Sequence, residues 1–270
     1  MRKIIFASLW ASSAAWAAVQ PESGLGLPHD ASRDGHLIDF LLNVTHVFNI
    51  ILFVIMCVWM GIACLKHNRH HPAQYDHGSS KRSVTIALCI SAFIFAVVDG
   101  NLFVNTMLDL HHAFWNFTIP AGDPNTIRVE VNAHQWAWDF RYAGPDGKFD
   151  TDDDIVTWNE LHVPEGKPVY LQLASMDVIH SFYLPNFRIK QDATPGLVNH
   201  LWFVAKEPGE FDIACAQHCG THHYKMKGHL TVESDADFQR WLAEAAQNSK
   251  RQFDPEDAQA HWGWNWKERQ

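Results

Sequence analysis

Two long stretches of the chain are apolar at almost every position, whereas most of the sequence beyond them alternates between apolar and polar residues. The first stretch, residues 38–65, has 28 residues, and a helix of that length, at ~1.5 Å per residue, exceeds the ~30 Å hydrocarbon core of a bilayer. The second stretch, residues 83–105, is interrupted by Asp99 and Gly100 near its far end. Both stretches are predicted to be transmembrane helices.

The N-terminus has the pattern of a bacterial secretory signal. Arg2 and Lys3 precede a short apolar run, and small residues around Ala17 form a cleavage pattern. The run is too short to span a bilayer, so residues 1–18 are predicted to be a signal peptide. Residues 19–37 then form an extracytoplasmic N-terminal segment.

The link between the two apolar stretches, residues 66–82, is basic. It carries four Lys and Arg residues and a single acid, Asp76. Because Lys and Arg accumulate in cytoplasmic loops of membrane proteins, this link is predicted to be cytoplasmic. The chain is therefore expected to be a multi-pass protein of a bacterial inner (cell) membrane, with everything after the second helix on the periplasmic side.

After Pro120 the pattern changes to short alternating segments that are rich in β-branched and aromatic residues. These segments, separated by Gly, Pro and Asp turns, are predicted to be strands, six or more in number. They predict one all-β domain over residues 120–234, a Greek-key sandwich or barrel. The segments are TIRVEVNAHQWAWDFRY, DIVTWNELHVP, PVYLQLASMD, HSFYLPNFRIK, NHLWFVAKEPGEFDIAC and GHLTVES.

Residues 235–270 form a C-terminal helix and tail. Residues 235–248 begin with acids and place apolar residues at helical spacing, which predicts an amphipathic helix. The tail beyond it interleaves tryptophans with polar residues, a pattern that predicts no particular contact. These tryptophans are Trp262, Trp264 and Trp266.

The net charge of −9 belongs to the part of the chain after the apolar stretches. Residues 112–270 contain 14 Lys and Arg against 23 Asp and Glu. An acidic domain makes nucleic acid an unsuitable partner. An acidic domain suits a basic protein partner, because complementary charge speeds the encounter of the two proteins. The alternative is that the charge serves only to keep the domain soluble.

Only two of the five cysteines lie in the polar part of the chain. Cys57, Cys64 and Cys89 sit in the apolar stretches, where a thiol behaves as a small hydrophobic group. Cys215 and Cys219 are four residues apart, too little material for a disulfide framework. A metal or redox role is the leading interpretation for this pair.

The segment CAQHCGTHHYKM places two thiols, an imidazole and a thioether in one turn-rich loop between two predicted strands. Soft ligands of this mixture favour copper, and zinc sites seldom include methionine. Two thiolates four residues apart could bridge two copper ions, and His180, at the start of a strand, could supply a second imidazole. The candidate ligands of the loop are Cys215, Cys219, His223 and Met226.

The pattern C-x3-C-x3-H-x2-M with an upstream D-V-x-H-S resembles the dinuclear copper (CuA) motif of cytochrome c oxidase subunit II. Nitrous oxide reductase has a similar copper loop, but the two anchoring helices and the order of elements resemble the oxidase subunit over residues 38–234. The resemblance implies a two-helix transmembrane hairpin followed by a cupredoxin-like Greek-key domain with a short C-terminal helix.

The resemblance also implies a role for each ligand. Cys215 and Cys219 would bridge both coppers, and His180 and His223 would each bind one of them. Met226 would be the weak ligand of one copper. In the same family the backbone carbonyl between the cysteines serves the other copper, and here that carbonyl belongs to Gln217.

The aromatic run HQWAWDF matches the H-Q-W-x-W strand of the family. The resemblance makes Trp136 the entry point for electrons from cytochrome c, with Trp138 beside it. Without the family context, tryptophans at positions i and i+2 of one strand are equally well explained as a packing cluster on one face.

The sequence departs from the family at three places. Gln217 stands where most members have a glutamate that helps to bind magnesium at the subunit I interface, and a neutral amide is a poorer ligand for that ion. The family's K-x-D-A-x-P-G-R run is KQDATPGL, with Leu197 in place of the arginine. The stretch SSKRSVTIAL lacks the glutamate that opens a proton path in the family.

An acidic segment, GPDGKFDTDDDI, offers a second candidate metal site. It is dense enough in carboxylates to chelate calcium, although it lacks the full EF-hand spacing. A solvated acidic hairpin is the alternative. The candidate ligands are Asp146, Asp150, Asp152 and Asp154, with Asp153 next to them.

The resemblance implies that reduced cytochrome c passes electrons to the copper pair, which relays them to the oxygen-reducing site of subunit I in a proton-pumping oxidase. A quinol oxidase subunit II would have the same fold without copper, and the retained ligands argue against it. A membrane-tethered copper-delivery or sensor protein would bind copper without relaying electrons. The tryptophan strand and the two anchors favour the relay.

Overall fold

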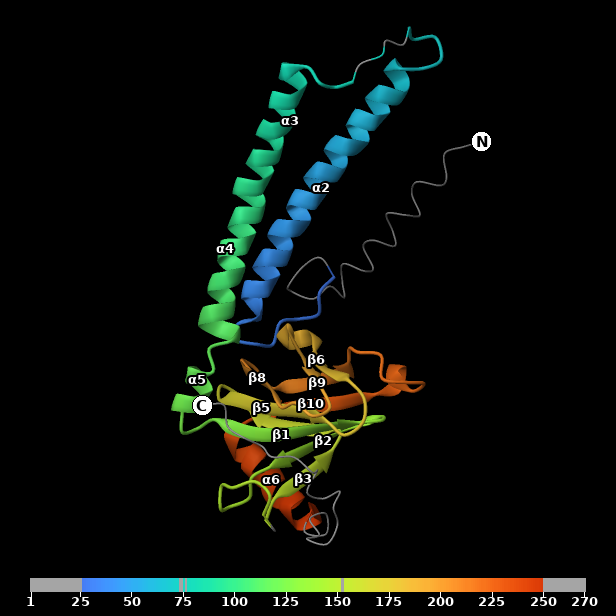
Figure 1. Ribbon diagram of the computed structural model, residues 1–270. Helices are drawn as coiled ribbons and strands as arrows, with labels where there is room; N and C mark the ends of the chain where they lie inside the picture. Colours follow the sequence, from blue (N-terminus) through green and yellow to red (C-terminus); the bar gives the residue numbers. More distant parts are fainter. Residues whose placement is uncertain (1–25, 73–74, 76, 152, 250–270) are drawn as a thin grey trace, which may run out of the picture. The chain divides into compact units, whose positions relative to one another are not determined.

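The computed structural model describes residues 26–72, 75, 77–151 and 153–249 (Figure 1). The predicted signal peptide and the Trp-rich tail lie outside the described residues. The chain divides into two compact units: Leu37–Trp115 forms one, and the segments on either side of it together form the other.

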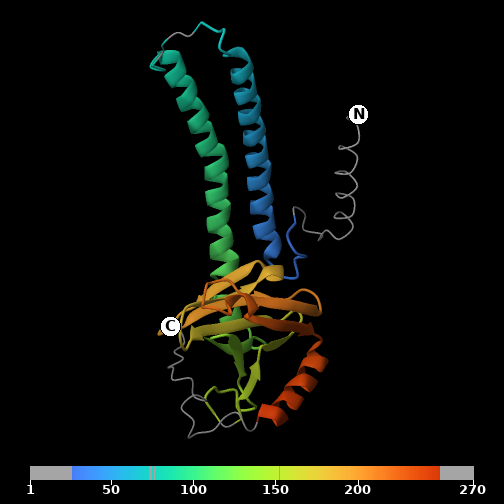
Figure 2. The ribbon, with the colours of Figure 1, turned by 90° about the vertical axis from the view of Figure 1, so that its right-hand side faces the viewer.

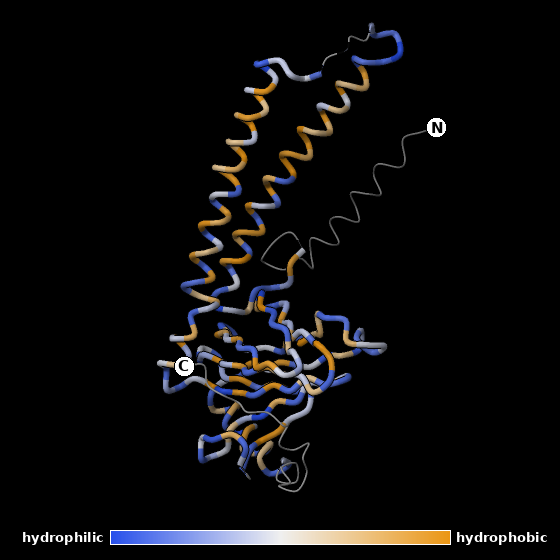
Figure 3. The backbone as a smooth tube through the Cα atoms, viewed as in Figure 1, coloured by the Kyte–Doolittle hydropathy of each residue, from blue (hydrophilic) through white to orange (hydrophobic). Residues whose placement is uncertain are grey.

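The helical unit contains the two apolar stretches. Helix α2 (Gly35–Lys66) includes the whole of the predicted span 38–65. Almost none of the apolar side chains of either span is buried, so these are not core helices of a soluble domain, and Figure 3 shows hydrophobic residues along most of both lengths. The second helical stretch consists of α3 (Lys81–Phe93), η1 (Ile94–Asp99), α4 (Gly100–Asp109), η2 (Leu110–Phe114) and α5 (Thr118–Gly122).

The second helix is not broken at Asp99 and Gly100. The chain passes through this point in a π-helical turn, η1, which ends at Asp99, and α4 begins at Gly100. The Gly100 N–H donates to the Phe95 carbonyl, which keeps the backbone paired. A single glycine is therefore tolerated here, because the widened turn still satisfies the backbone hydrogen bonds.

The other unit is a sandwich of two five-stranded sheets. One sheet has the strand order β3-β2-β1-β5-β8 and the other β4-β10-β9-β6-β7. The strands are β1 (Ile127–His134), β2 (Ala137–Tyr142), β3 (Ile155–Trp158), β4 (Glu160–Pro164), β5 (Pro168–Ser175), β6 (His180–Leu184), β7 (Ile189–Ala193), β8 (Asn199–Val204), β9 (Gly209–Cys215) and β10 (Lys227–Glu233).

The core lies between the sheets. In β1, Val129, Val131 and Ala133 are buried, and the polar residues between them, Glu130 and Asn132, are buried as well, so both faces of this strand are covered. The second sheet contributes fully buried apolar residues such as Leu230. The predicted fold class, an apolar helix pair followed by a cupredoxin-like all-β domain and a C-terminal helix, is confirmed.

Four of the six alternating segments contain two strands each, which raises the number of strands to ten. In the first segment, Gln135 and Trp136 form the tight turn of an antiparallel hairpin in which His134 pairs with Ala137. In two others the chain turns at Asn159 and Arg188, both with φ of 59°. A two-residue turn preserves the alternation, so the pattern alone does not reveal it.

Helix α6 (Asp235–Ser249) packs against β3 and β4, the edge strands of the two sheets (Figure 2). Ser234 caps it, because its Oγ accepts the Asp237 N–H at 3.2 Å. Its Trp241 ring stacks on His162 of β4 with ring centroids 3.9 Å apart. The predicted amphipathic helix is thus fixed by its aromatic face.

The segment before α2 is bound to the edge of the same sandwich. Ser32 forms an isolated antiparallel bridge with Ala205, directly after β8. The Arg33 N–H donates to the Val204 carbonyl at 2.9 Å. The end of the predicted extracytoplasmic segment 19–37 therefore adds a short strand-like edge to the β3-β2-β1-β5-β8 sheet.

Candidate metal centre

Strand pairing brings the predicted copper ligands to one end of the sandwich. Cys215 is the last residue of β9, and His180 is the first residue of β6. The two strands are antiparallel neighbours, with Phe182 opposite Cys215. The loop 216–226 between β9 and β10 then supplies the other ligands, with His223 opening a short 3-10 turn.

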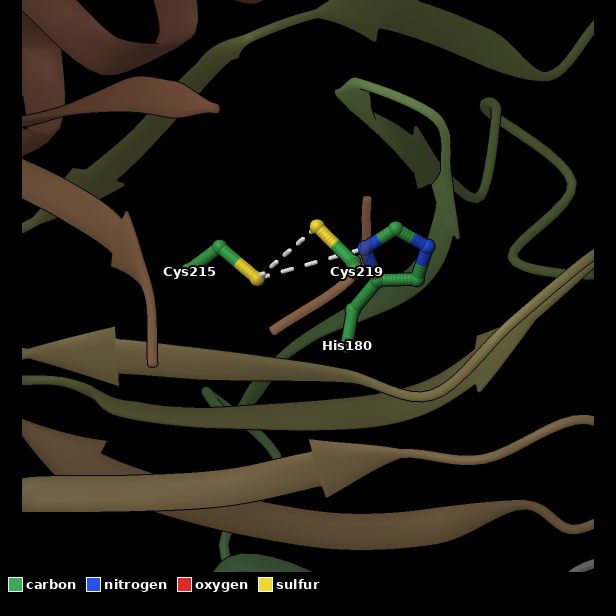
Figure 4. Close-up of side chains that lie close together, drawn as sticks. All are labelled: His180, Cys215 and Cys219. Atoms are coloured by element: carbon green, nitrogen blue, oxygen red, sulfur yellow. Dashed lines mark hydrogen bonds between the residues drawn. The ribbon is translucent and has the colours of Figure 1, made fainter. Parts of the chain in front are cut away.

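The donor atoms lie within contact distance of one another (Figure 4). The Sγ atoms of Cys215 and Cys219 are 3.7 Å apart, and the Cys215 Sγ is 3.9 Å from Nδ1 of His180. On the other side, the Cys219 Sγ is 3.6 Å from Nδ1 of His223. Two sulfur atoms are thus flanked by one imidazole on each side.

Met226 and Gln217 complete the group. The Met226 Sδ lies 3.1 Å from Nδ1 of His180 and 3.8 Å from the Cys219 Sγ. The Gln217 carbonyl oxygen is 3.2 Å from the Cys215 Sγ, while the Gln217 side chain is exposed. Two thiols, two imidazoles, a thioether and a carbonyl around one point fit soft copper ions.

The sulfur atoms and one imidazole are shielded from water. Cys219 is 2% exposed, Met226 3% and His180 0%. Within the described part of the chain, the only group of three or more His, Cys, Asp or Glu residues close enough to share an ion is His180, Cys215 and Cys219.

Asp177 orients the His180 ring. Its carboxylate is 2.8 Å from Nε2 of His180, so Nδ1 is the nitrogen that faces the sulfur atoms. The same carboxylate accepts the backbone N–H of Gln135 at 2.7 Å. Burial opposes ionisation of Asp177, but its hydrogen bonds outweigh burial and lower the pKa of the carboxyl. A carboxylate behind a ligating histidine is a common means of fixing its ring.

The two thiols ionise unequally. Burial alone would raise the pKa of Cys215, but hydrogen bonds from His180 and from backbone groups outweigh it and lower that pKa. Burial, together with the negative charge on Cys215, raises the pKa of Cys219. One thiolate therefore forms readily, and the second needs a cation beside it, as a metal ion would provide.

Trp136 and Trp138 occupy different positions around the site, which corrects the expectation that both lie on one strand. Trp136 is half-buried in the hairpin turn, and its Nε1–H donates to the Cys219 carbonyl at 3.3 Å. Trp138 is fully buried in β2, edge-on to His180 with ring centroids 6.1 Å apart. Trp136 contacts the ligand loop, and Trp138 packs against the candidate ligand His180.

The sequence alone did not identify two residues of this region. Gln135 donates from Nε2 to the Cys219 carbonyl at 2.7 Å, so the hairpin turn is tied to the ligand loop by a second side chain. His222 packs against Trp136 with ring centroids 4.5 Å apart. Both flank motif residues, but only the turn at Gln135 and Trp136 brings them together.

The acidic loop between β2 and β3 uses part of its carboxylate groups internally. Asp154 accepts the Asp150 N–H at 2.7 Å, and Asp153 accepts the Thr151 hydroxyl at 2.7 Å. Asp146 accepts the Lys148 N–H at 2.8 Å. Asp152 lies outside the described residues. The calcium site stays a prediction, with self-capped turns as the competing explanation.

Arg141 lies beneath this loop and brings three acids together. Its guanidinium bonds to Glu130, its cross-strand partner, and both side chains are fully buried. Its Nε is also 3.6 Å from Asp154, and its Nη1 is 3.6 Å from Asp150. Two of the candidate calcium ligands therefore already face a permanent positive charge, which weakens the site for a cation.

Comparisons with known proteins point to one family, whose model covers the candidate ligands. The family model described as "Cytochrome C oxidase subunit II, periplasmic domain" matches residues 149–234, which include all the candidate copper ligands. The "Alternative cytochrome c oxidase subunit 2" of Bradyrhizobium diazoefficiens is 33% identical over 233 residues, a match that covers 76% of this chain and 79% of the relative.

Two further similarities each cover less than half of this chain. The "Cytochrome c oxidase subunit 2" of Thermostichus vulcanus is 42% identical over 120 residues, which cover 44% of this chain and 34% of the relative. The crystal structure of the periplasmic domain of cytochrome oxidase subunit II of Bradyrhizobium japonicum is 30% identical, with a TM-score of 0.41, and the match covers 45% of this chain and 94% of that one.

Proposed function

Because the chain belongs to the family of cytochrome c oxidase subunit II, we propose that it takes electrons from a c-type cytochrome and passes them to subunit I of the same oxidase. The chain is a membrane-anchored subunit with an extracytoplasmic domain. The observation that carries the proposal is the pair of thiols 3.7 Å apart with an imidazole on each side.

The residues that would hold copper are those of the predicted motif. Cys215 and Cys219 would bridge two ions as thiolates, with His180 and His223 as the imidazole ligands. Met226 and the Gln217 carbonyl would be the weak ligands. Bound there, a copper pair would take up one electron at a time from the donor and release it to a haem of subunit I.

The protein's own part in the transfer is to connect the surface to the thiols. Trp136 is half-buried at the tip of the hairpin, and its indole N–H donates to the carbonyl of Cys219, a proposed bridging residue. Electron transfer slows steeply with distance, so a residue in contact with both solvent and ligand loop is well placed as the entry point. The acidic charge of the domain suits a basic cytochrome.

The basic charge of the link between the two spans supports a membrane topology in which this link is cytoplasmic. The four Lys and Arg residues of residues 66–82 favour a cytoplasmic position for this loop in a bacterium, with two spans in the inner membrane. Subunit I would then contact the spans and the ligand end of the domain. The side chain of Gln217 is neutral, so we expect no magnesium bound by this position.

A membrane-tethered copper-delivery or sensor protein is the alternative function. Such a protein must release copper or respond to it, whereas here Cys219, Met226 and His180 are almost wholly buried. Burial of the ligands limits exchange of the metal and favours a permanent centre.

Electron transfer from a cytochrome tests the proposal directly. The full chain, loaded with copper in detergent, is mixed with a reduced c-type cytochrome, and oxidation of the cytochrome is followed by absorbance. We expect rapid oxidation that requires copper and slows in Trp136→Phe. Oxidation at the same rate without copper, or none with it, would contradict the relay.

A further inference from the structure

Three residues of the ligand loop lie against the Trp136 indole. Its Nε1–H donates to the Cys219 carbonyl at 3.3 Å. Gly220 lies so close to the ring that a Cβ there would come within 3.2 Å of Cζ2 and 3.3 Å of Nε1. His222 is the third of these residues, with ring centroids 4.5 Å apart and the ring planes at 56°.

Gly220 makes this approach possible. Its φ of 122° lies in a region that side chains rarely adopt, and a Cβ would also come within 2.8 Å of the Gln135 Nε2. The loop therefore passes directly against the hairpin tip. This close passage brings His222 to the Trp136 ring.

His222 has no part in the proposed copper ligand set. The loop contains His218, His222 and His223, and only His223 contacts a bridging cysteine through Nδ1. The His222 side chain is exposed, and its Nδ1 is 3.2 Å from the Thr221 hydroxyl, which restrains the ring. Its contact with the Trp136 ring instead connects it to the proposed entry point.

We propose that His222 is a positioning residue that holds the Trp136 indole against the Cys219 carbonyl for electron entry. This inference rests on the proposed function, in which Trp136 receives the electron. A tryptophan at the tip of a two-residue turn would otherwise have several rotamers open to it. A second ring packed against the indole restricts those rotamers, as aromatic pairs in tilted geometry do.

His222 also widens the surface that a donor can meet. Its exposed ring adjoins the half-buried indole, so the two form one aromatic surface at the ligand end of the domain. A haem edge of a c-type cytochrome is flat and apolar, and such a surface suits it.

The first experiment measures electron entry with variants of the full chain, loaded with copper in detergent. His222→Ala should slow oxidation of a reduced c-type cytochrome several-fold, with an unchanged copper spectrum and an unchanged rate of reduction by ascorbate. His222→Phe keeps a ring against Trp136 and should restore most of the rate. Tyr224→Ala, an exposed ring of the same loop that contacts Lys225, is the matched control and should behave as wild type.

The second experiment needs no copper. Fluorine NMR of the metal-free full chain labelled with fluorotryptophan would report each indole, and the Trp136 resonance is identified by its loss in Trp136→Phe. His222→Ala should shift or broaden that resonance, and Tyr224→Ala should not. If His222 only supported the loop elsewhere, the Trp136 resonance of His222→Ala would keep its position and width.

The outcomes separate this inference from the proposal on which it rests. If Trp136→Phe slows oxidation and His222→Ala changes neither rate nor resonance, the positioning role is overturned and the entry point stands. If Trp136→Phe itself leaves the rate unchanged, the entry point is overturned and the positioning role with it. A His222→Phe variant as slow as His222→Ala would overturn the argument from ring packing.

Discussion

The carboxylate of Asp177 lies 2.8 Å from Nε2 of His180, and this contact leaves Nδ1 of the same ring facing the sulfur atoms of the ligand loop. The same carboxylate binds the backbone of Gln135, which precedes Trp136. One acidic side chain thus fixes both a proposed metal ligand and the hairpin tip that carries the proposed electron-entry residue. It links the two parts of the proposed relay.

Asp177→Asn is predicted to weaken copper binding. The amide can still accept a hydrogen bond but no longer supplies a negative charge behind the imidazole, so His180 becomes a poorer ligand. Loss of such a partner lowers metal affinity by roughly 10–100-fold. Competition with a copper chelator measures the affinity. Asp212→Asn, which removes an exposed carboxylate that pairs with Lys227, is the matched control and should leave it unchanged.

Arg141→Ala is predicted to destabilise the domain by about 3–5 kcal/mol, because it leaves the buried carboxylates of Glu130 and Asp154 without their cation. Thermal unfolding in detergent, followed by circular dichroism, measures the loss. Arg240→Ala removes an exposed arginine paired with Asp237 and should change little. Equal effects of the two variants would refute a special role for the buried cluster.

Glu130 is predicted to give the fold a pH dependence. Burial outweighs the attraction of Arg141 and raises the pKa of Glu130 from 4.5 to about 7. The folded state therefore binds the Glu130 proton more tightly than the unfolded state does. The resulting contribution to the free energy of unfolding is complete below pH 4.5 and is lost as the pH rises towards about 7. The loss is of the order of a few kcal/mol, at ~1.4 kcal/mol per pKa unit.

Glu130→Gln should flatten that dependence. Unfolding free energies of wild type and variant, measured across this pH range, give the comparison. Burial also raises the pKa of Asp154, to about 6. The variant should therefore keep part of the decrease in unfolding free energy with pH. A wild-type stability that increases over the same range would contradict the assignment.

Calcium is expected to bind the acidic loop only weakly. Asp150 and Asp154 face Arg141, and Asp146 caps its own turn, so few carboxylate oxygens remain for an ion. Calorimetric titration of the full chain with Ca²⁺ should give no saturating heat. A saturable heat that disappears in Asp150→Asn would instead establish the calcium site predicted from the sequence.

The grouping of the candidate ligands could be predicted from the sequence because it depends on residue type and spacing within one loop. Cys215, Cys219 and Met226 lie in one segment, and strand pairing then places His180 beside them as expected. The helical spans could also be predicted from the sequence, since a long run of apolar residues marks each of them.

Two features could not be predicted, for different reasons. The hairpin turn at Gln135 and Trp136 contains no Gly, Pro, Asn or Asp, so nothing in the composition marks a turn there. Glu130 and Arg141 occupy alternate strand positions that normally face water, and only pairing of their strands shows that they neutralise each other inside the protein.

We infer that Cys215 and Cys219 hold two copper ions that share an electron, and the EPR spectrum of the copper-loaded full chain reports this sharing. An electron shared equally by two copper nuclei gives seven hyperfine lines, whereas an electron on one copper gives four. We expect the seven-line spectrum for wild type and its collapse in Cys219→Ser. A four-line wild-type spectrum, or a shared-electron spectrum that survives in Cys219→Ser, would contradict it.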